Sequence, residues 1–294
     1  MSRPWVFGEV VFDVFPDGRE VLGGAPFNVA WHLHGLGCNP LLLTRVGRDR
    51  RGEEVLARMA EVGMDTTGVQ VDSERPTGVV RVELEDGQPR FSIAEGVAWD
   101  AIEFPPAPEK DEKAPAWLVA GSLALQGSVN RRTLAQILET YQPRLFVDVN
   151  LRPPWFTRPT LDWLLAQAAW VKLNREEAAQ LGWEVGAEGA NLPELCKRFG
   201  LEGIALTLGD GGAVLATPQR RVRVEPVPVE GLVDTVGAGD AFTAVLVLGL
   251  LRGSPWERSG AAAALLASRI CSIRGAVPAE QGWYREVARL LDSS

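Results

Sequence analysis

The sequence predicts an α/β protein in which a largely parallel sheet is covered by helices on both faces, giving three layers. Short apolar runs alternate with helix-like segments along the middle of the chain, and strands spaced by helices of this length pair in parallel. The strand candidates are residues 116–120, 144–149, 169–173 and 203–208, and the helix candidates are residues 129–141, 160–167, 175–181 and 190–199. A length of 294 residues with 46% apolar residues is enough for a large buried core.

The first third of the chain continues this alternation with one interruption. The expected elements are β structure at residues 5–15, a helix from Pro26 to about Leu36, a strand at 41–46 and a helix at 51–62. Residues 78–95 instead alternate apolar and polar side chains around a Glu-Asp-Gly-Gln turn. This pattern predicts a hairpin with one face in water, inserted into the main fold.

The remaining segments complete the expected organisation. Residues 104–115 are rich in proline and charge, which predicts a connector. A late antiparallel hairpin is expected at 212–216 and 220–225, and three closing helices are expected at about 238–252, 256–271 and 279–291.

Composition excludes several classes of function. The formal net charge is −8 and no basic run stands out, which argues against binding to nucleic acid or to an anionic membrane. The three cysteines are far apart, so neither a disulfide framework nor a CxxC metal site is indicated. The N-terminus lacks the apolar stretch of a secretory signal, and no segment is typical of a membrane span. We therefore expect a soluble cytoplasmic protein.

The most informative motif is Asp-Thr-Val-Gly-Ala-Gly-Asp-Ala-Phe at residues 234–242, which leads directly into an apolar helix. Gly237 and Gly239 let the backbone approach a ligand closely, and free N–H groups at a helix N-terminus attract an anion. Asp240 would lie beside that anion, where a carboxylate suits a base that accepts a proton during phosphoryl transfer. The alternative is an aspartate that only satisfies backbone N–H groups at the helix start.

Other polar residues follow the strands of the expected sheet, where ligands of α/β folds gather. Asn174 and Glu177 have the spacing of a capping box, but they could also lie near a magnesium ion, through water. Arg152 suits a phosphate or a sugar hydroxyl, and its alternative role is a surface ion pair.

The N-terminal half offers further candidates. Gly24 belongs to a turn of small residues that a ligand could approach, and Asn28 offers both a donor and an acceptor, although both also suit an ordinary helix start. Asp13 could accept hydrogen bonds from two hydroxyls, or it could be a solvated charge on an edge strand. Thr207 and Gly209 open a glycine-rich strand exit that could border a nucleotide or form a plain hairpin turn.

Several nucleotide-binding signatures are absent from the sequence. No Gly-Lys-Ser or Gly-Lys-Thr follows a glycine loop, so a Walker-type site is not indicated. The Gly237 turn has a phenylalanine where a dinucleotide fingerprint needs its last glycine, which disfavours a nicotinamide oxidoreductase. Protein-kinase signatures are also missing.

These motifs resemble, along essentially the whole chain, the ribokinase or PfkB type of carbohydrate kinase, and most of all its fructokinase branch. The matching segments, in the order of the family, are Gly8-Glu9 with Asp13, Gly23–Ala25 with Asn28, Asp148–Arg152, Asn174–Glu177 and Asp234–Phe242. The last segment is the most specific signature of the family. The resemblance implies a single Rossmann-like domain over residues 1–294, with a small β lid from residues 9–22 and 78–103.

The resemblance also implies roles for individual residues. Asp240 would be the catalytic base, and the backbone N–H groups from Val236 through Gly237, Ala238 and Gly239 would form an anion hole. The sugar would contact Asp13, Gly24, Asn28 and Arg152, and Phe91 or Trp99 would close over it from the lid. ATP would be bordered by Asn174, Thr207, Gly209 and the segment Ile273–Val277, which contains Gly275. Asn174 and Glu177 would lie near Mg²⁺, and Asp234 near a K⁺ ion.

The expected activity is ATP-dependent phosphorylation of a sugar hydroxymethyl group, with fructose converted to fructose 6-phosphate. Ribose, 2-keto-3-deoxygluconate, a nucleoside or a sugar phosphate remain alternative substrates for the same fold. A non-catalytic regulatory protein is a further alternative, which the presence of Asp240 and both glycines disfavours. The family also implies that two lids could pair to form a homodimer.

Overall fold

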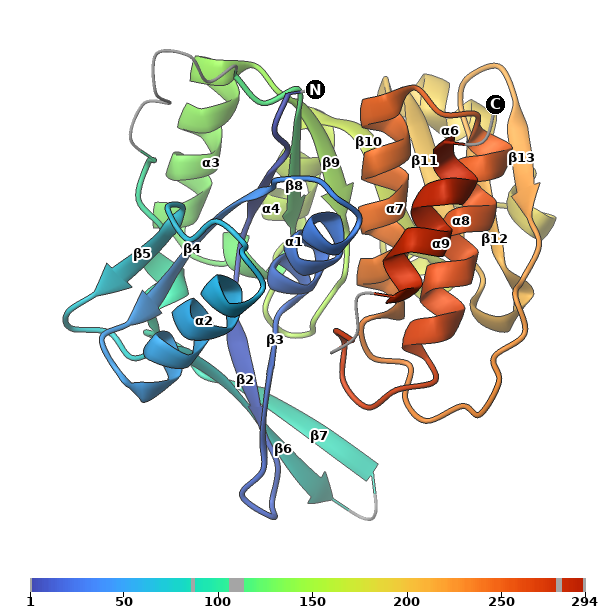
Figure 1. Cartoon of the computed structure of the whole chain (residues 1–294). Helices are drawn as coiled ribbons and strands as arrows, with labels where there is room; N and C mark the ends of the chain where they lie inside the picture. The colour runs from blue at the N-terminus through green and yellow to red at the C-terminus, as the bar shows by residue number, and fades with distance from the viewer. Residues whose placement is uncertain (1, 86–87, 106–113, 279–281, 293–294) are drawn as a thin grey trace.

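Two sheets organise the chain in the computed structural model, which describes residues 2–85, 88–105, 114–278 and 282–292 (Figure 1). The large sheet has nine strands within these residues. In spatial order they are β13 (Arg221–Val224), β12 (Ala213–Ala216), β11 (Gly203–Thr207), β10 (Ala168–Asn174), β9 (Arg144–Asp148), β8 (Trp117–Gly121), β1 (Trp5–Phe7), β4 (Leu41–Gly47) and β5 (Val69–Asp72). The run from β11 to β5 is parallel, and only β12 and β13 are antiparallel to their neighbours.

Helices cover both faces of the large sheet, as expected for a three-layer α/β/α fold (Figure 1). One face packs against α1 (Ala25–Gly35), α2 (Arg50–Glu61), α7 (Ala238–Arg252), α8 (Trp256–Ile270) and α9 (Gly282–Asp292). The other packs against α3 (Ser128–Tyr141), α4 (Arg158–Gln167), α5 (Arg175–Gln180) and α6 (Leu192–Phe199). Successive residues of a strand belong to opposite cores, as Phe146 and Val147 of β9 do, because side chains alternate along a strand.

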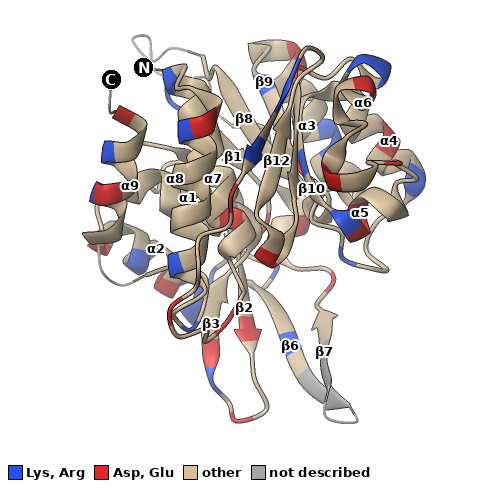
Figure 2. Ribbon diagram, turned by 90° about the vertical axis from the view of Figure 1, so that its right-hand side faces the viewer, with Lys and Arg blue, Asp and Glu red and all other residues tan. Residues whose placement is uncertain are grey.

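The small sheet, defined by the strand order β3-β2-β6-β7, extends away from the main body (Figures 1 and 2). Its strands are β3 (Glu20–Gly23), β2 (Val11–Val14), β6 (Gly78–Glu85) and β7 (Gln88–Ile93). Strand β2 is antiparallel to β3 and parallel to β6, so two segments distant in the sequence meet here. Figure 2 shows acidic and basic residues interspersed along the ribbon of the described residues.

Most expected elements are confirmed, including β structure within residues 5–15; one strand was not expected, and the lid strands expected to run to residue 103 end earlier. Residues 5–15 form two strands in different sheets, because the chain turns at Gly8, whose φ is 149°. Strand β5 (Val69–Asp72) was not expected. The small sheet ends at Ile93, and the 3₁₀ turn Ala98–Ala101 packs instead against β4 and α3. Within the expected connector and the last expected helix, residues 106–113 and 279–281 lie outside the described residues.

Candidate active site

The N-terminus of α7 is the centre of the candidate site. Gly237 precedes the helix with a φ of 81°, and an added Cβ there would lie 2.4 Å from the Cβ of Ala276. Both facts require glycine at this position. Within the described residues no side chain caps the helix, so N–H groups of its first turn remain available as donors for an anion.

Two of the backbone N–H groups expected to form an anion hole already have hydrogen-bond partners in the structure. The Val236 N–H donates to Oδ1 of Asp234 at 3.1 Å, and the Ala238 N–H donates to the Thr235 carbonyl at 3.3 Å. These two donors are therefore engaged, although the longer bond is weak. The part of the expected anion hole that best suits a ligand is thus the turn of Gly237 and Gly239.

Asp240 lies in the first turn of α7, half-buried, where its Oδ2 accepts a hydrogen bond from Nδ2 of Asn28 at 2.8 Å. Burial and the nearby Asp148 raise its pKa to about 6, against the lowering effects of Asn28, Lys172 and Arg152. A carboxyl with this pKa is ionised at neutral pH yet basic enough to accept a proton. Asn28 is 3% exposed, and its Oδ1 has no partner among the described residues.

Arg152 and Asp13 approach the same region from other elements. Arg152 follows β9, is exposed, and donates through Nη1 to the Leu151 carbonyl at 3.2 Å. Its positive charge lowers the pKa of Glu9, Asp13 and Asp240, so it lies within electrostatic reach of all three carboxyls. Burial nevertheless raises the pKa of Asp13 to about 6, with a further contribution from Asp234. The fold thus brings together residues that the sequence holds far apart.

Two features of this region contain residues to which the sequence assigned no role. One is a buried cluster of Asp148, Lys172 and Thr243, beside α7. The other is Glu9, which joins β1 to β2, is 4% exposed, and has an Oε2 with no partner among the described residues. Burial is the main cause that raises the pKa of Glu9 to about 7, and the charges of Asp240 and Asp148 act in the same direction. Hydrogen bonding to its own backbone and the charge of Arg152 act to lower the pKa.

The raised pKa of Glu9 makes folding stability depend on pH. Below pH 4.5 the group is protonated in both the folded and the unfolded chain. Between pH 4.5 and about 7 only the folded chain keeps the proton on Glu9. The contribution of Glu9 to the free energy of unfolding therefore falls as pH rises, by about 3 kcal/mol in all. Glu9→Gln is expected to remove this loss and to be more stable than the wild type at pH 8. Urea unfolding at pH 5 and pH 8 measures the effect, and an unaltered pH dependence would refute it.

The capping box predicted at the start of α5 is present. Oδ1 of Asn174 accepts from the Glu177 N–H at 2.9 Å, and Oε2 of Glu177 accepts from the Asn174 N–H at 2.8 Å. Oε1 of Glu177 accepts from the Leu151 N–H at 3.0 Å, so both carboxylate oxygens already bind backbone groups. Across the described residues no group of three or more His, Cys, Asp or Glu side chains is arranged to hold a metal ion.

The residues expected at the nucleotide lie at the end of a strand or in the loops beyond the strands. Thr207 ends β11 half-buried, and Gly209 begins an exposed 3₁₀ turn with a φ of 60°. Gly275 has a φ of 84°, and an added Cβ would lie 3.5 Å from Val21 of β3, so this loop reaches the small sheet. Asp234 is half-buried, and its N–H donates to the Cys271 carbonyl at 3.2 Å.

The two aromatic residues expected in the lid differ in position. Phe91 lies on β7 and is 54% exposed, so it is free to contact a ligand. Trp99 is fully buried, and its Nε1 lies 2.4 Å from where a Cβ of Gly78 would be. Trp99 therefore fills the core beneath the small sheet, and the expectation that it closes over a ligand was wrong.

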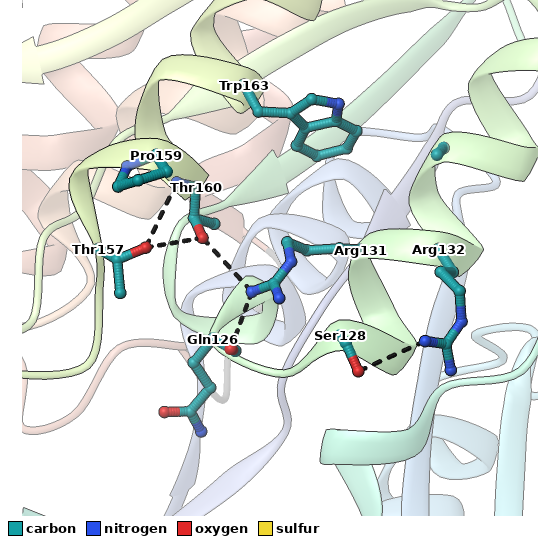
Figure 3. A pocket seen from close by; sticks show the side chains of 9 residues that line it. Gln126, Ser128, Arg131, Arg132, Thr157, Pro159, Thr160 and Trp163 are labelled. Atoms are coloured by element: carbon teal, nitrogen blue, oxygen red, sulfur yellow. Dashed lines mark hydrogen bonds between the residues drawn. The ribbon is translucent and has the colours of Figure 1, made fainter.

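A separate hollow of about 580 Å³ lies between α3 and α4 (Figure 3). Its lining includes Trp163 and Pro159, and Arg131 there donates to the carbonyls of Leu125 and Gln126 at 3.0 Å. None of the expected site residues lines it. The hollow is thus distinct from the residues gathered at α7.

Comparison with known proteins identifies relatives along nearly the whole chain. The fructokinase of Klebsiella pneumoniae is 31% identical over 290 residues, which cover 92% of both chains. The aminoimidazole riboside kinase of Salmonella typhimurium is 25% identical and covers 92% of this chain and 88% of its own. The crystal structure of a Vibrio cholerae fructokinase with fructose, ADP and calcium superposes with a TM-score of 0.78 at 26% identity, covering 99% of both chains. A double mutant of that enzyme was crystallised with fructose, ADP and potassium.

Two further findings bear on the class of protein. No helix in the described part of the chain has the length and apolarity that crossing a membrane requires. The profile of the pfkB family carbohydrate kinases matches residues 8–281. This match includes the glycine turn, Asp240, Asn28 and the capping box, and the fold is that of the family's solved structures. The chain belongs to the pfkB family of carbohydrate kinases.

Proposed function

We propose that this protein transfers the terminal phosphoryl group of ATP to the hydroxymethyl oxygen of a sugar, with fructose as the substrate and fructose 6-phosphate as the product. The observation that carries the proposal is the position of Asp240, held by Asn28 at the uncapped N-terminus of α7. The fructokinases among the relatives support fructose as the sugar.

In the proposed mechanism Asp240 accepts the proton of the attacking hydroxyl. The N–H groups of the Gly237–Gly239 turn and the positive end of α7 stabilise charge on the transferring phosphoryl group. Because little covalent chemistry is left for the protein, positioning of the two reactants supplies much of the rate. Movement of the small sheet over the sugar would exclude water and limit hydrolysis of ATP.

The sugar is proposed to lie between α1 and the small sheet. Asn28 has an unpartnered Oδ1 that can accept a hydrogen bond from a hydroxyl. Asp13 and Arg152 would bind further hydroxyls from the opposite side, and exposed Phe91 would close over the ring. Gly24, with a φ of 108°, keeps the start of α1 free of a side chain.

The residues fit magnesium bound through water. Both oxygens of Glu177 accept backbone hydrogen bonds, so they can order water around an ion more readily than ligate it. Mg²⁺ keeps several waters and is commonly held through substrate phosphates. When bound, the ion would neutralise charge on the ATP phosphates. A monovalent cation is proposed near Asp234, and pairing of two small sheets into a homodimer remains a prediction.

Glu177→Gln is expected to raise the magnesium concentration needed for half-maximal rate by about tenfold, because the carboxylate's charge is lost. The rate is measured over a magnesium titration. Glu176→Gln, on the exposed side of the same helix, is the matched control and is expected to resemble the wild type. An unchanged titration in Glu177→Gln would remove Glu177 from the surroundings of the metal.

The proposed function is tested by measuring ADP release with fructose, ribose, 2-keto-3-deoxygluconate, nucleosides and sugar phosphates. The expected result is release with fructose, with the product's phosphate position determined by NMR. Release with a nucleoside alone would favour the second candidate, a nucleoside kinase, which the similarity to aminoimidazole riboside kinase supports. Absence of release with every acceptor would contradict a kinase function.

A further inference from the structure

Lys172 is a buried cation in the middle of the large sheet. It lies on β10 directly opposite Asp148 of β9, and it is 7% exposed. Its Nζ lies 2.8 Å from both carboxylate oxygens of Asp148, and the Thr243 hydroxyl of α7 donates to Oδ2 of Asp148 at 2.7 Å. The cluster therefore ties the centre of the sheet to the second turn of α7.

The ammonium lies next to the anion-binding turn. A Cβ added to Gly239 would lie 3.1 Å from Nζ and 3.8 Å from Cε of Lys172. An ammonium group has three N–H donors, and Asp148 accepts from Nζ with two oxygens on one side. The ammonium also lies against the start of α7, where a side chain at position 239 would press on it.

Lys172 is charged at neutral pH despite its burial. Burial acts to lower its pKa, but Asp148 and, more weakly, Asp240 and Glu177 raise the pKa above its ordinary value. A buried ion pair is a weak source of stability, because removing two charges from water offsets their attraction. The position of Lys172, within electrostatic reach of Asp240 and Glu177 and against Gly239, is the feature that needs a functional explanation.

We propose that Lys172 is a further catalytic residue, a fixed positive charge held by Asp148 and Thr243 against the Gly239 turn, where it stabilises the transferring phosphoryl group. This proposal rests on the kinase function proposed above. In the step, a bond forms between the sugar oxygen and the terminal phosphorus of ATP, and the bond from that phosphorus to the bridging oxygen breaks. The hydroxyl proton goes to Asp240, the electron pair leaves with ADP, and Lys172 keeps all its protons.

Two other roles for Lys172 give different expectations. If Lys172 has a purely structural role, a variant that removes both charges of the pair should have the kcat of the wild type, because no buried charge is left unpaired. If Lys172 acts only by lowering the pKa of Asp240, the loss of kcat should disappear at higher pH, where Asp240 is ionised. Asp148 raises the pKa of Asp240 more than Lys172 lowers it, so removing both charges together does not raise that pKa.

The decisive variant is therefore the charge-balanced pair Lys172→Met with Asp148→Asn. It keeps the volume of both side chains, leaves no unpaired charge, and leaves Thr243 an acceptor. We expect kcat to fall by about 100-fold or more, with the KM for the sugar and the affinity for ADP nearly unchanged. The fold-loss is expected to be the same from pH 6.5 to pH 9. Lys197→Met, an exposed lysine on α6, is the matched control and is expected to match the wild type.

Each outcome of this experiment is informative. A folded double variant with the kcat of the wild type, or a loss that disappears at high pH, overturns the proposal. Should the double variant not fold, Thr243→Val leaves the ion pair intact and removes only the hydroxyl that orients Asp148. A fall in kcat of several-fold at constant KM then supports the proposal, and an unchanged kcat overturns it. If the wild type itself turns over no acceptor, the kinase function fails, and the role of Lys172 fails with it.

Discussion

Asparagine in place of Asp240 is expected to lower kcat by about 1,000-fold or more. The amide has the shape of the carboxylate and can still accept from Asn28, but it cannot take the proton of the attacking hydroxyl. Folding and nucleotide binding should therefore persist while turnover is lost. ADP release in the presence of the sugar measures the rate, and calorimetry with ADP measures nucleotide binding.

The matched control is Asp162→Asn, which removes an exposed carboxylate that pairs with Arg158 on α4. A single exposed pair contributes little to stability, so this variant should match the wild type in rate. Near-normal turnover by the Asp240 variant would show that the proton leaves by another route. The base would then have to be sought among the other carboxyls whose pKa burial raises, which are Glu9, Asp13 and Glu177 among the described residues.

Alanine in place of Gly237 is expected to lower the free energy of unfolding by about 3 kcal/mol and to abolish activity. A φ of 81° is strained for any residue with a Cβ, and the new methyl group would lie 2.4 Å from Cβ and 2.5 Å from Cα of Ala276. The start of α7 would have to move to relieve this overlap, and the first-turn N–H groups would lose their direction. Urea unfolding and ADP release test both parts.

The other end of the same helix supplies the control for Gly237. Gly253 follows α7 with a similar φ of 65°, but no atom lies within 4 Å of an added Cβ. Gly253→Ala is therefore expected to cost about 1 kcal/mol, which is the backbone strain alone, and to leave activity unchanged. Equal losses of stability in the two variants would mean that contact with Ala276 is unimportant.

Much of the fold follows from regular patterns in the sequence. The alternation from residue 116 to 208 corresponds to β8 through β11, because apolar runs between amphipathic helices have few other solutions. Residues 5–15 were harder, since the sequence does not tell whether a single glycine within a β segment marks a bulge or a change of sheet. Strand β5 has only four residues, which is too short for a clear period.

The candidate site was predictable where residues lie within one local motif. Asp240 and its two glycines are adjacent in sequence, and the Asn174–Glu177 capping box spans a single turn. The hydrogen bond from Asn28 to Asp240 joins residues 212 positions apart, and no local pattern predicts it. Lys172 did leave a signal, because a lysine inside an apolar parallel strand must be paired when buried. Trp99 was misplaced because aromatic content alone does not separate a core side chain from a binding one.

The two connections that join the sheets near β1 touch one another. Residues Gly8–Val10 lead from β1 into β2, and Gly24 leads from β3 into α1. A Cβ on Gly24 would lie 2.6 Å from the Glu9 carbonyl oxygen, and one on Gly8 would lie 2.5 Å from Cγ of Pro26. Gly24 thus rests on the backbone of Glu9 and Gly8 on the ring of Pro26, with no room for a larger residue at either glycine. The two connections are therefore fixed against one another at the edge of the candidate site, and the backbone of Glu9 is part of that contact.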